Sequence, residues 1–288
     1  MIALYKKELK SYLTSMIGYV FIAFVLVVVG IFFTAYNLSM GYPKFSVTMN
    51  SITVIYLITI PLLTMRIFAE ETKQKTDQLL YTSPVSVGSI IIGKFLAVVT
   101  VFAIPMAIIC LYPLILTTFG EVELPGAYTS ILGFFLLGCA YISIGMFLSS
   151  ITESQIIAAV LTFAALYVSS YLISGISNLI PNTAAASWLS FTIMILVVAA
   201  LMYGIIKNIM IATGLAVLAE GILTALYLLK PALISGKIQS FLSIFNLNSR
   251  FTTMLNDILD VNSVVYLISV SAFFLFLTHQ MIQKRRWN

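Results

Sequence analysis

The fold of this chain is decided by the charged stretch Arg66-Ile-Phe-Ala-Glu-Glu-Thr-Lys-Gln-Lys-Thr-Asp-Gln-Leu-Leu-Tyr-Thr-Ser-Pro84, which lies between two long apolar segments. With Lys94 just beyond it, the stretch holds three acidic and four basic residues, in a chain of which only 9% is charged. We expect these side chains to lie in water, at the point where two helices leave a membrane. A soluble partner could contact the chain there.

The composition places the rest of the chain in a bilayer. Of its 288 residues, 61% are hydrophobic, and the mean hydropathy is +1.08. A soluble domain of this size needs more polar surface to cover its core. Several apolar runs reach the roughly 20 residues that span a bilayer as a helix. The sequence therefore predicts an all-α polytopic membrane protein.

Hydropathy in a window of about 19 residues indicates eight candidate spans. They are approximately 17–36, 51–69, 89–118, 127–149, 155–177, 186–206, 209–229 and 263–282. The sixth and seventh are separated only by Ile206-Lys207-Asn208, so they could instead be one hairpin, or one full span with re-entrant pieces. We expect six to eight transmembrane helices in a membrane domain over 17–288.

The basic residues indicate how the spans are oriented. If the amino terminus is inside, eleven of the fifteen Lys and Arg residues face the cytoplasm, which the positive-inside rule favours. These are Lys6, Lys7, Lys10, Arg66, Lys73, Lys75, Lys94, Lys207, Lys284, Arg285 and Arg286. Both termini are therefore predicted to be cytoplasmic. The segment 230–261 then lies outside, and the spacing of its apolar residues predicts short amphipathic helices on the outer surface.

Residues 1–16 have the pattern of an amphipathic helix. The apolar face would hold Ile2, Tyr5, Leu9, Tyr12, Leu13 and Met16, and the other face Lys6, Lys7, Lys10 and Thr14. One interpretation is an interfacial helix on the inner leaflet that meets anionic membrane lipid. Its candidate residues are Tyr5, Lys6, Lys7, Glu8 and Lys10. The alternative is a basic cluster that only orients the first span.

The segment 66–84 can form a short cytoplasmic coupling helix between spans 2 and 3. Leu79 and Leu80 would pack inward, and Pro84 would end the helix before the third span. The side chains expected to be exposed are Glu70, Glu71, Lys73, Lys75 and Asp77, and Thr76 and Gln78 complete the candidate contact surface. The alternative is a solvated loop that only separates two helices.

Other motifs do not support catalysis or nucleotide binding by this chain. The run Gly88-Ser-Ile-Ile-Ile-Gly-Lys-Phe95 approaches a phosphate-binding loop, but Phe95 stands where Ser or Thr must bind magnesium. No catalytic or metal-ligand spacing is found, so we expect neither enzyme activity nor a metal site. The pI near 9.1 arises from bases that flank the membrane, which does not indicate nucleic-acid binding.

Glu220 is the only acidic residue well inside a predicted span. A carboxylate within the membrane is costly and is by default a functional candidate, which could bind a cation or take up a proton. The alternative is a protonated side chain that bonds to neighbouring Ser, Thr or Tyr groups in a helix interface.

Three parts of the chain resemble the permease subunits of ABC-2-type ATP-binding-cassette transporters, particularly those of the gliding-motility type. The similar parts are Tyr5-Lys-Lys-Glu-Leu-Lys-Ser-Tyr-Leu-Thr-Ser-Met-Ile-Gly-Tyr-Val-Phe21, the segments Met65–Glu71, Leu79–Ser86 and Gly93–Phe95, and the tail from Val265 to Trp287. Lys75-Thr-Asp-Gln78 departs from the Gly-Thr-x-Glu usual in the family, and Met16 replaces a Pro.

The resemblance implies the passive half of an exporter in a bacterial plasma membrane. A separate ABC ATPase subunit would bind ATP and Mg²⁺ and push on residues 66–84, and a second permease chain, identical or a sister subunit, would complete the path. Two alternatives remain at this point: a secondary transporter driven by an ion gradient, and a non-transporting membrane partner of an ATPase that acts on the cell envelope.

Overall fold

The computed structural model describes residues 1–76, 85–256 and 259–287. Within these residues the chain is helical, with no β-strand, and it divides into two compact units. Unit 1 comprises Met1–Val168 and Asn248–Asn288, and unit 2 comprises Ser169–Leu247. In the described part of the chain, seven helices are long and apolar enough to cross a membrane, or eight if one bent pair of helices is a span. The predicted all-α polytopic fold is confirmed.

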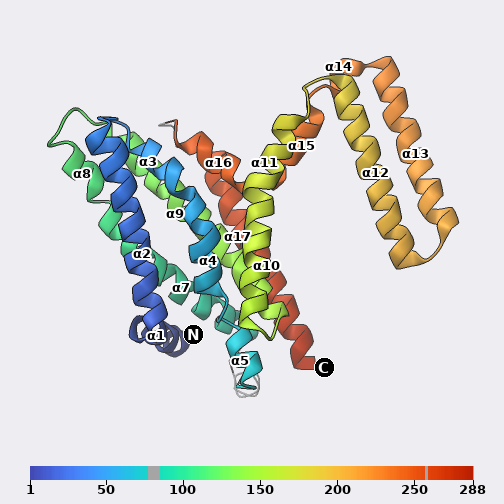
Figure 1. The fold of residues 1–288 in the computed structure, drawn as a ribbon. Helices are drawn as coiled ribbons and strands as arrows, with labels where there is room; N and C mark the ends of the chain where they lie inside the picture. Colours follow the sequence, from blue (N-terminus) through green and yellow to red (C-terminus); the bar gives the residue numbers. More distant parts are fainter. Residues whose placement is uncertain (77–84, 257–258, 288) are drawn as a thin grey trace. The chain divides into compact units, whose positions relative to one another are not determined.

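Unit 1 is built around one long central helix, α9 (Figure 1). Its helices are α1 (Ile2–Thr14), α2 (Met16–Phe32), α3 (Phe45–Ser51), α4 (Tyr56–Thr64), α5 (Ala69–Lys73), α7 (Val87–Ile109), α8 (Tyr112–Leu116), α9 (Leu124–Ile151), α10 (Gln155–Tyr167), α16 (Leu247–Met254, of which Leu247 belongs to unit 2) and α17 (Val261–Trp287). Helices α3, α4, α7, α10 and α17 all pack against α9.

Small residues on α9 allow this close packing. A Cβ atom at Gly138 would lie 2.5 Å from the ring of Phe102 on α7, and a Cβ atom at Gly145 would lie 2.3 Å from Oγ1 of Thr64 on α4. The hydroxyl of Tyr56 donates a 2.6 Å hydrogen bond to the carbonyl of Phe134 at the same level. These contacts fix α4 and α7 against α9.

The amino-terminal helix ends earlier than the sequence predicted. The expected helix over 1–16 stops at Thr14, because Ser15 is extended, and Met16 begins α2 with an exposed side chain. Gly18 lies so close to α1 that a Cβ atom there would be 2.2 Å from the Tyr12 carbonyl oxygen. The placement of Met16 on the apolar face of the first helix was therefore wrong.

Unit 2 contains the predicted sixth and seventh spans as an antiparallel helical hairpin, α12–α13 (Figure 1). Its helices are α11 (Ile173–Leu179), α12 (Ala184–Ile206), α13 (Ile209–Leu229), α14 (Pro231–Ile234) and α15 (Lys237–Phe245). Lys207, with φ of 54°, makes the left-handed turn of the hairpin. The bent pair is Thr213–Leu229 with Pro231–Phe245, at 119°. The short helices predicted over 230–261 are α14, α15 and α16; their position on the outer surface stays a prediction.

Candidate functional site

A buried lysine joins three elements at one end of unit 1. Lys94 lies about two turns into α7, and its side chain is 1% exposed. Its Nζ donates to Oε1 of Glu71 at 2.7 Å, to the carbonyl oxygen of Ile67 at 3.0 Å and to Oε1 of Glu8 at 3.3 Å. The three donors of the ammonium group are thus all used. Lys94 thereby ties α1 and the start of α5 to α7.

The amino-terminal end of α5 is held by a serine of α9. Ser149 Oγ accepts hydrogen bonds from the backbone N–H groups of Phe68 and Ala69, both at 3.2 Å, and donates to the carbonyl of Met65 at 3.2 Å. These N–H groups have no partner inside the helix, so a side chain of another helix takes the place of a local cap.

The carboxyl-terminal helix also reaches α5. One guanidinium nitrogen of Arg285 donates to Thr72 Oγ1 and another to the carbonyl of Ile151, both at 3.1 Å. The end of α17, the end of α9 and helix α5 therefore meet. In unit 1 the two termini lie at the same end, beside α5 (Figure 1).

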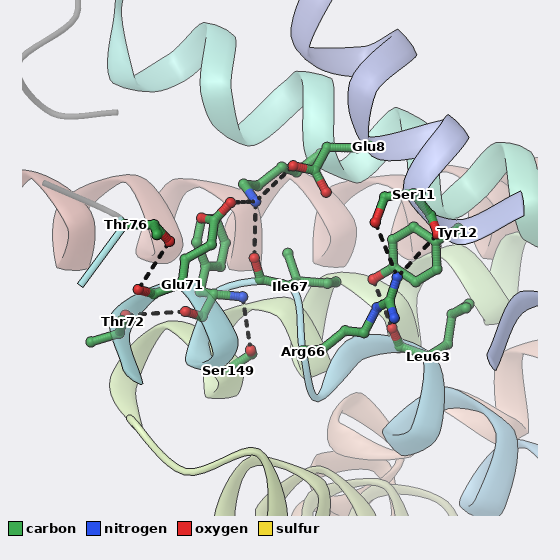
Figure 2. A network of polar contacts seen from close by, with 12 residues as sticks. Glu8, Ser11, Tyr12, Leu63, Arg66, Ile67, Glu71, Thr72, Thr76 and Ser149 are labelled. Carbon is green, nitrogen blue, oxygen red and sulfur yellow. Dashed lines mark hydrogen bonds and ion pairs between the residues drawn. The ribbon is translucent and has the colours of Figure 1, made fainter. Parts of the chain in front are cut away.

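Helix α1 is anchored beside α5 by a second set of contacts (Figure 2). The Tyr12 hydroxyl donates to the carbonyl of Leu63 at 3.0 Å, and the Arg66 guanidinium stacks over the Tyr12 ring at 4.5 Å and donates to Ser11 Oγ at 3.4 Å. Burial raises the pKa of Tyr12 well above its usual value, so the phenol stays protonated and keeps this hydrogen bond.

The predicted coupling residues fall into three groups. Lys73 and Lys75 are exposed, as predicted, and Thr76 is exposed as well; Lys73 ends α5 and the other two follow it. Asp77, Gln78, Leu79, Leu80 and Pro84 lie outside the described residues. Glu70 and Glu71 are half-buried, so the prediction that both are exposed was wrong. The physical reason for Glu71 is its ion pair with Lys94, a base that was expected to lie in water.

Glu70 borders two surface hollows. One, of about 280 Å³, is lined by α1 and residues 66–76, and the other, of about 380 Å³, is lined by Glu70, Lys73, Gln74, Ser154, Gln155 and Ile156. Within the described part of the chain, the Glu70 side chain has no ion-pair or hydrogen-bond partner. Its carboxylate is therefore available to a group from outside.

The candidate residues of α1 lie on two sides. Lys6, Lys7 and Lys10 are exposed, whereas Tyr5 and Glu8 face α7, where the Tyr5 hydroxyl lies 3.0 Å from Thr100 Oγ1. Helix α1 packs along α7, so part of its apolar face is covered by protein. Contact of the lysines with lipid headgroups stays a prediction.

The sequence interpretation counted Lys94 with the charged stretch but expected it to lie in water, and it missed Ser149 and Arg285 as parts of this site. Of the three, only Lys94 carried a sequence signal for burial, because a lysine about one and a half turns inside the predicted span 89–118 requires a buried partner. Ser149 and Arg285 look like an ordinary helix serine and an ordinary membrane-flanking base, and their role depends on contacts far along the chain.

Glu220 lies in the hairpin of unit 2 and is distant in sequence from the residues that contact α5. Thr192 Oγ1 on α12 lies 2.9 Å from Glu220 Oε1 and donates to it. This is the hydrogen bond in a helix interface that the sequence left open as one alternative. The described residues contain no group of three or more His, Cys, Asp or Glu side chains that could hold a metal ion.

A comparison with protein families matches residues 34–278 to the family described as ABC-2 family transporter protein. No curated protein matches the chain. The match begins in span 1 and ends inside α17, so it contains α5, Lys94, Ser149 and Glu220.

Proposed function

The chain belongs to the ABC-2 family of transporter proteins, and from this membership we propose that α5 with residues 74–76 is the surface on which its ATPase docks. The chain is a polytopic permease domain. ATP hydrolysis by a partner ATPase supplies the energy for transport. The domain itself is non-catalytic and carries no cofactor. An ion-gradient carrier does not fit this membership.

The observation that carries the proposal is the attachment of α5 to three spans at once. Lys94 connects it to α7, Ser149 to α9 and Arg285 to α17. A force on the exposed residues that follow α5 would therefore reach all three helices, instead of being absorbed by a loose loop. ATP-driven closure of the ATPase would tilt these spans as a group.

The same proposal includes the orientation of the chain, the extent of the docking surface, a second permease chain and the direction of transport. Both termini and α5 face the cytoplasm, which the excess of bases at this end supports. Asp77 to Pro84 extend the docking surface. A second permease chain completes the transport path, and the complex exports its substrate from a bacterial cell. The amino-terminal and coupling segments resemble those of gliding-motility permeases, and this resemblance supports a permease of that type.

Glu70 gives a clean test of the docking surface, because its carboxylate has no partner among the described residues. We expect Glu70→Lys to reduce co-purification of the nucleotide-binding subunit by about tenfold or more, because losing a charged contact costs about 1.5–3 kcal/mol. The measurement is mild-detergent purification from the native host with quantitative mass spectrometry.

Glu123→Lys is the matched control, since Glu123 is exposed and makes no side-chain cap at the start of α9. The proposal requires the ATPase to remain with this control. Equal ATPase recovery from the two folded variants would exclude Glu70 from the docking surface.

A further inference from the structure

The hairpin of unit 2 has a half-open apolar cavity between α12 and α13, whose lining residues Val198 and Leu215 are each 48% exposed. Its volume is about 300 Å³, at the lower end of the range of small-molecule pockets. The lining side chains are all apolar: Met194, Ile195, Val198, Ala199, Met202, Leu215, Ala216 and Ala219. Two of them are methionines, whose flexible side chains adapt to ligands of different shape. The cavity therefore suits a flexible hydrocarbon group.

A carboxyl group lies one helical turn beyond this lining. Glu220 follows Ala216 by four residues, and Thr192 precedes Ile195 by three, so both lie on the same helix faces as the lining residues. The 2.9 Å hydrogen bond between Thr192 and Glu220 closes this end of the hairpin interface. Helix spacing thus places one acidic group a turn away from lining residues that are themselves all apolar.

The Glu220 carboxyl group is poorly satisfied. Thr192 has a single hydroxyl proton, and the carbonyl of Trp188, at 3.0 Å, competes for it with Oε1. Glu220 Oε2 is buried and bonds to no group in the described part of the chain, where Glu220 also has no ion pair. A carboxylate buried in a membrane span requires a cation or a proton beside it.

We propose that the α12–α13 hairpin binds an amphiphilic cation, an amine or quaternary ammonium with an apolar body. The cationic group pairs with Glu220 Oε2, and the apolar body fills the cavity beside it. Charge complementarity selects this ligand over a neutral amphiphile, and the apolar lining selects it over a small hydrated cation. This ligand site is separate from the proposed ATPase docking surface, and the ligand binds to it without the partner subunit.

The test uses the full chain, without ATPase, in nanodiscs of zwitterionic lipid. The probe is dodecyltrimethylammonium, and dodecanol is its neutral counterpart. Trp188 is a built-in reporter, since it stacks on Tyr227 at 5.6 Å and lies one turn from Thr192. The chain has two Trp residues, so Trp287→Phe leaves Trp188 as the sole source of the signal.

We expect a saturable change in Trp188 emission with the cation, and an affinity about tenfold or more lower in Glu220→Gln, which keeps the shape of the side chain. Ala219→Leu, which fills the cavity and leaves the carboxyl group, should weaken binding similarly. Glu123→Gln is the matched control and should not change the affinity. Identical Trp188 emission before titration shows that each variant keeps its hairpin.

Three results would overturn the proposal: no saturable response in the parent protein, equal affinity for the cation in Glu220→Gln, or dodecanol binding as tightly as the cation. The first two leave Glu220 with only its hydrogen bond to Thr192. The third makes the cavity a site for neutral amphiphiles. None of these results bears on ATPase docking, which this experiment does not include.

Discussion

Replacing Lys94 with methionine is expected to lower the free energy of unfolding by about 3–5 kcal/mol, the usual cost of removing one partner from a buried ion pair. The substitution leaves Glu8 and Glu71 near each other without the cation that both contact, at 3.3 and 2.7 Å. It also leaves the carbonyl of Ile67 without this donor. Unfolding by sodium dodecyl sulfate, followed by circular dichroism, measures the loss.

Two further variants separate the ion pair from the loss of a long side chain. Lys10→Met changes an exposed lysine of α1 and should alter stability by less than about 0.5 kcal/mol. Adding Glu8→Gln and Glu71→Gln to Lys94→Met removes the unpaired charges and should restore much of the stability. If Lys94→Met unfolds at the same detergent concentration as the parent protein, the buried network is not a structural link.

Gly18→Ala is the second substitution expected to have a large effect. The new methyl group would lie 2.2 Å from the Tyr12 carbonyl oxygen and 3.0 Å from the carbonyl carbon, both backbone atoms that cannot rotate away. Overpacking of this kind typically costs about 1–3 kcal/mol. Because α1 must shift, the hydrogen bond from Tyr12 to Leu63 should also weaken.

The same unfolding measurement, with co-purification of the ATPase, tests this prediction. Gly88→Ala provides the control, since a Cβ atom at Gly88, in the first turn of α7, has nothing within 4 Å. A Gly18→Ala protein as stable as Gly88→Ala would show that α1 does not pack on α2 as described.

Hydropathy was sufficient to predict most of the spans, because a helix in lipid needs a long apolar run whatever its neighbours are. It also placed the hairpin turn near Lys207, where a basic residue interrupts two such runs. It could not predict the division into two units, which depends on packing between helices.

The candidate site was only partly predictable, for a related reason. Local charge pointed to residues 66–84 as a surface, and in the part of this segment that the structure describes, Lys73, Lys75 and Thr76 are exposed. Whether Glu71 faces water or Lys94 depends on how α5 sits against α7, which charge alone does not specify. The contact of Arg285 with Thr72 joins residues more than 200 positions apart, so local sequence patterns could not predict it.

The central claim, that the ATPase docks on α5 and the residues after it, is tested most directly by photo-crosslinking in native membranes. A benzoylphenylalanine placed at the exposed Gln74 should crosslink to the nucleotide-binding subunit, whereas one placed at Phe119, which is 72% exposed and lies between α8 and α9, should not. A crosslink from Phe119 but not from Gln74, in a complex that still contains the ATPase, would contradict the docking surface proposed here.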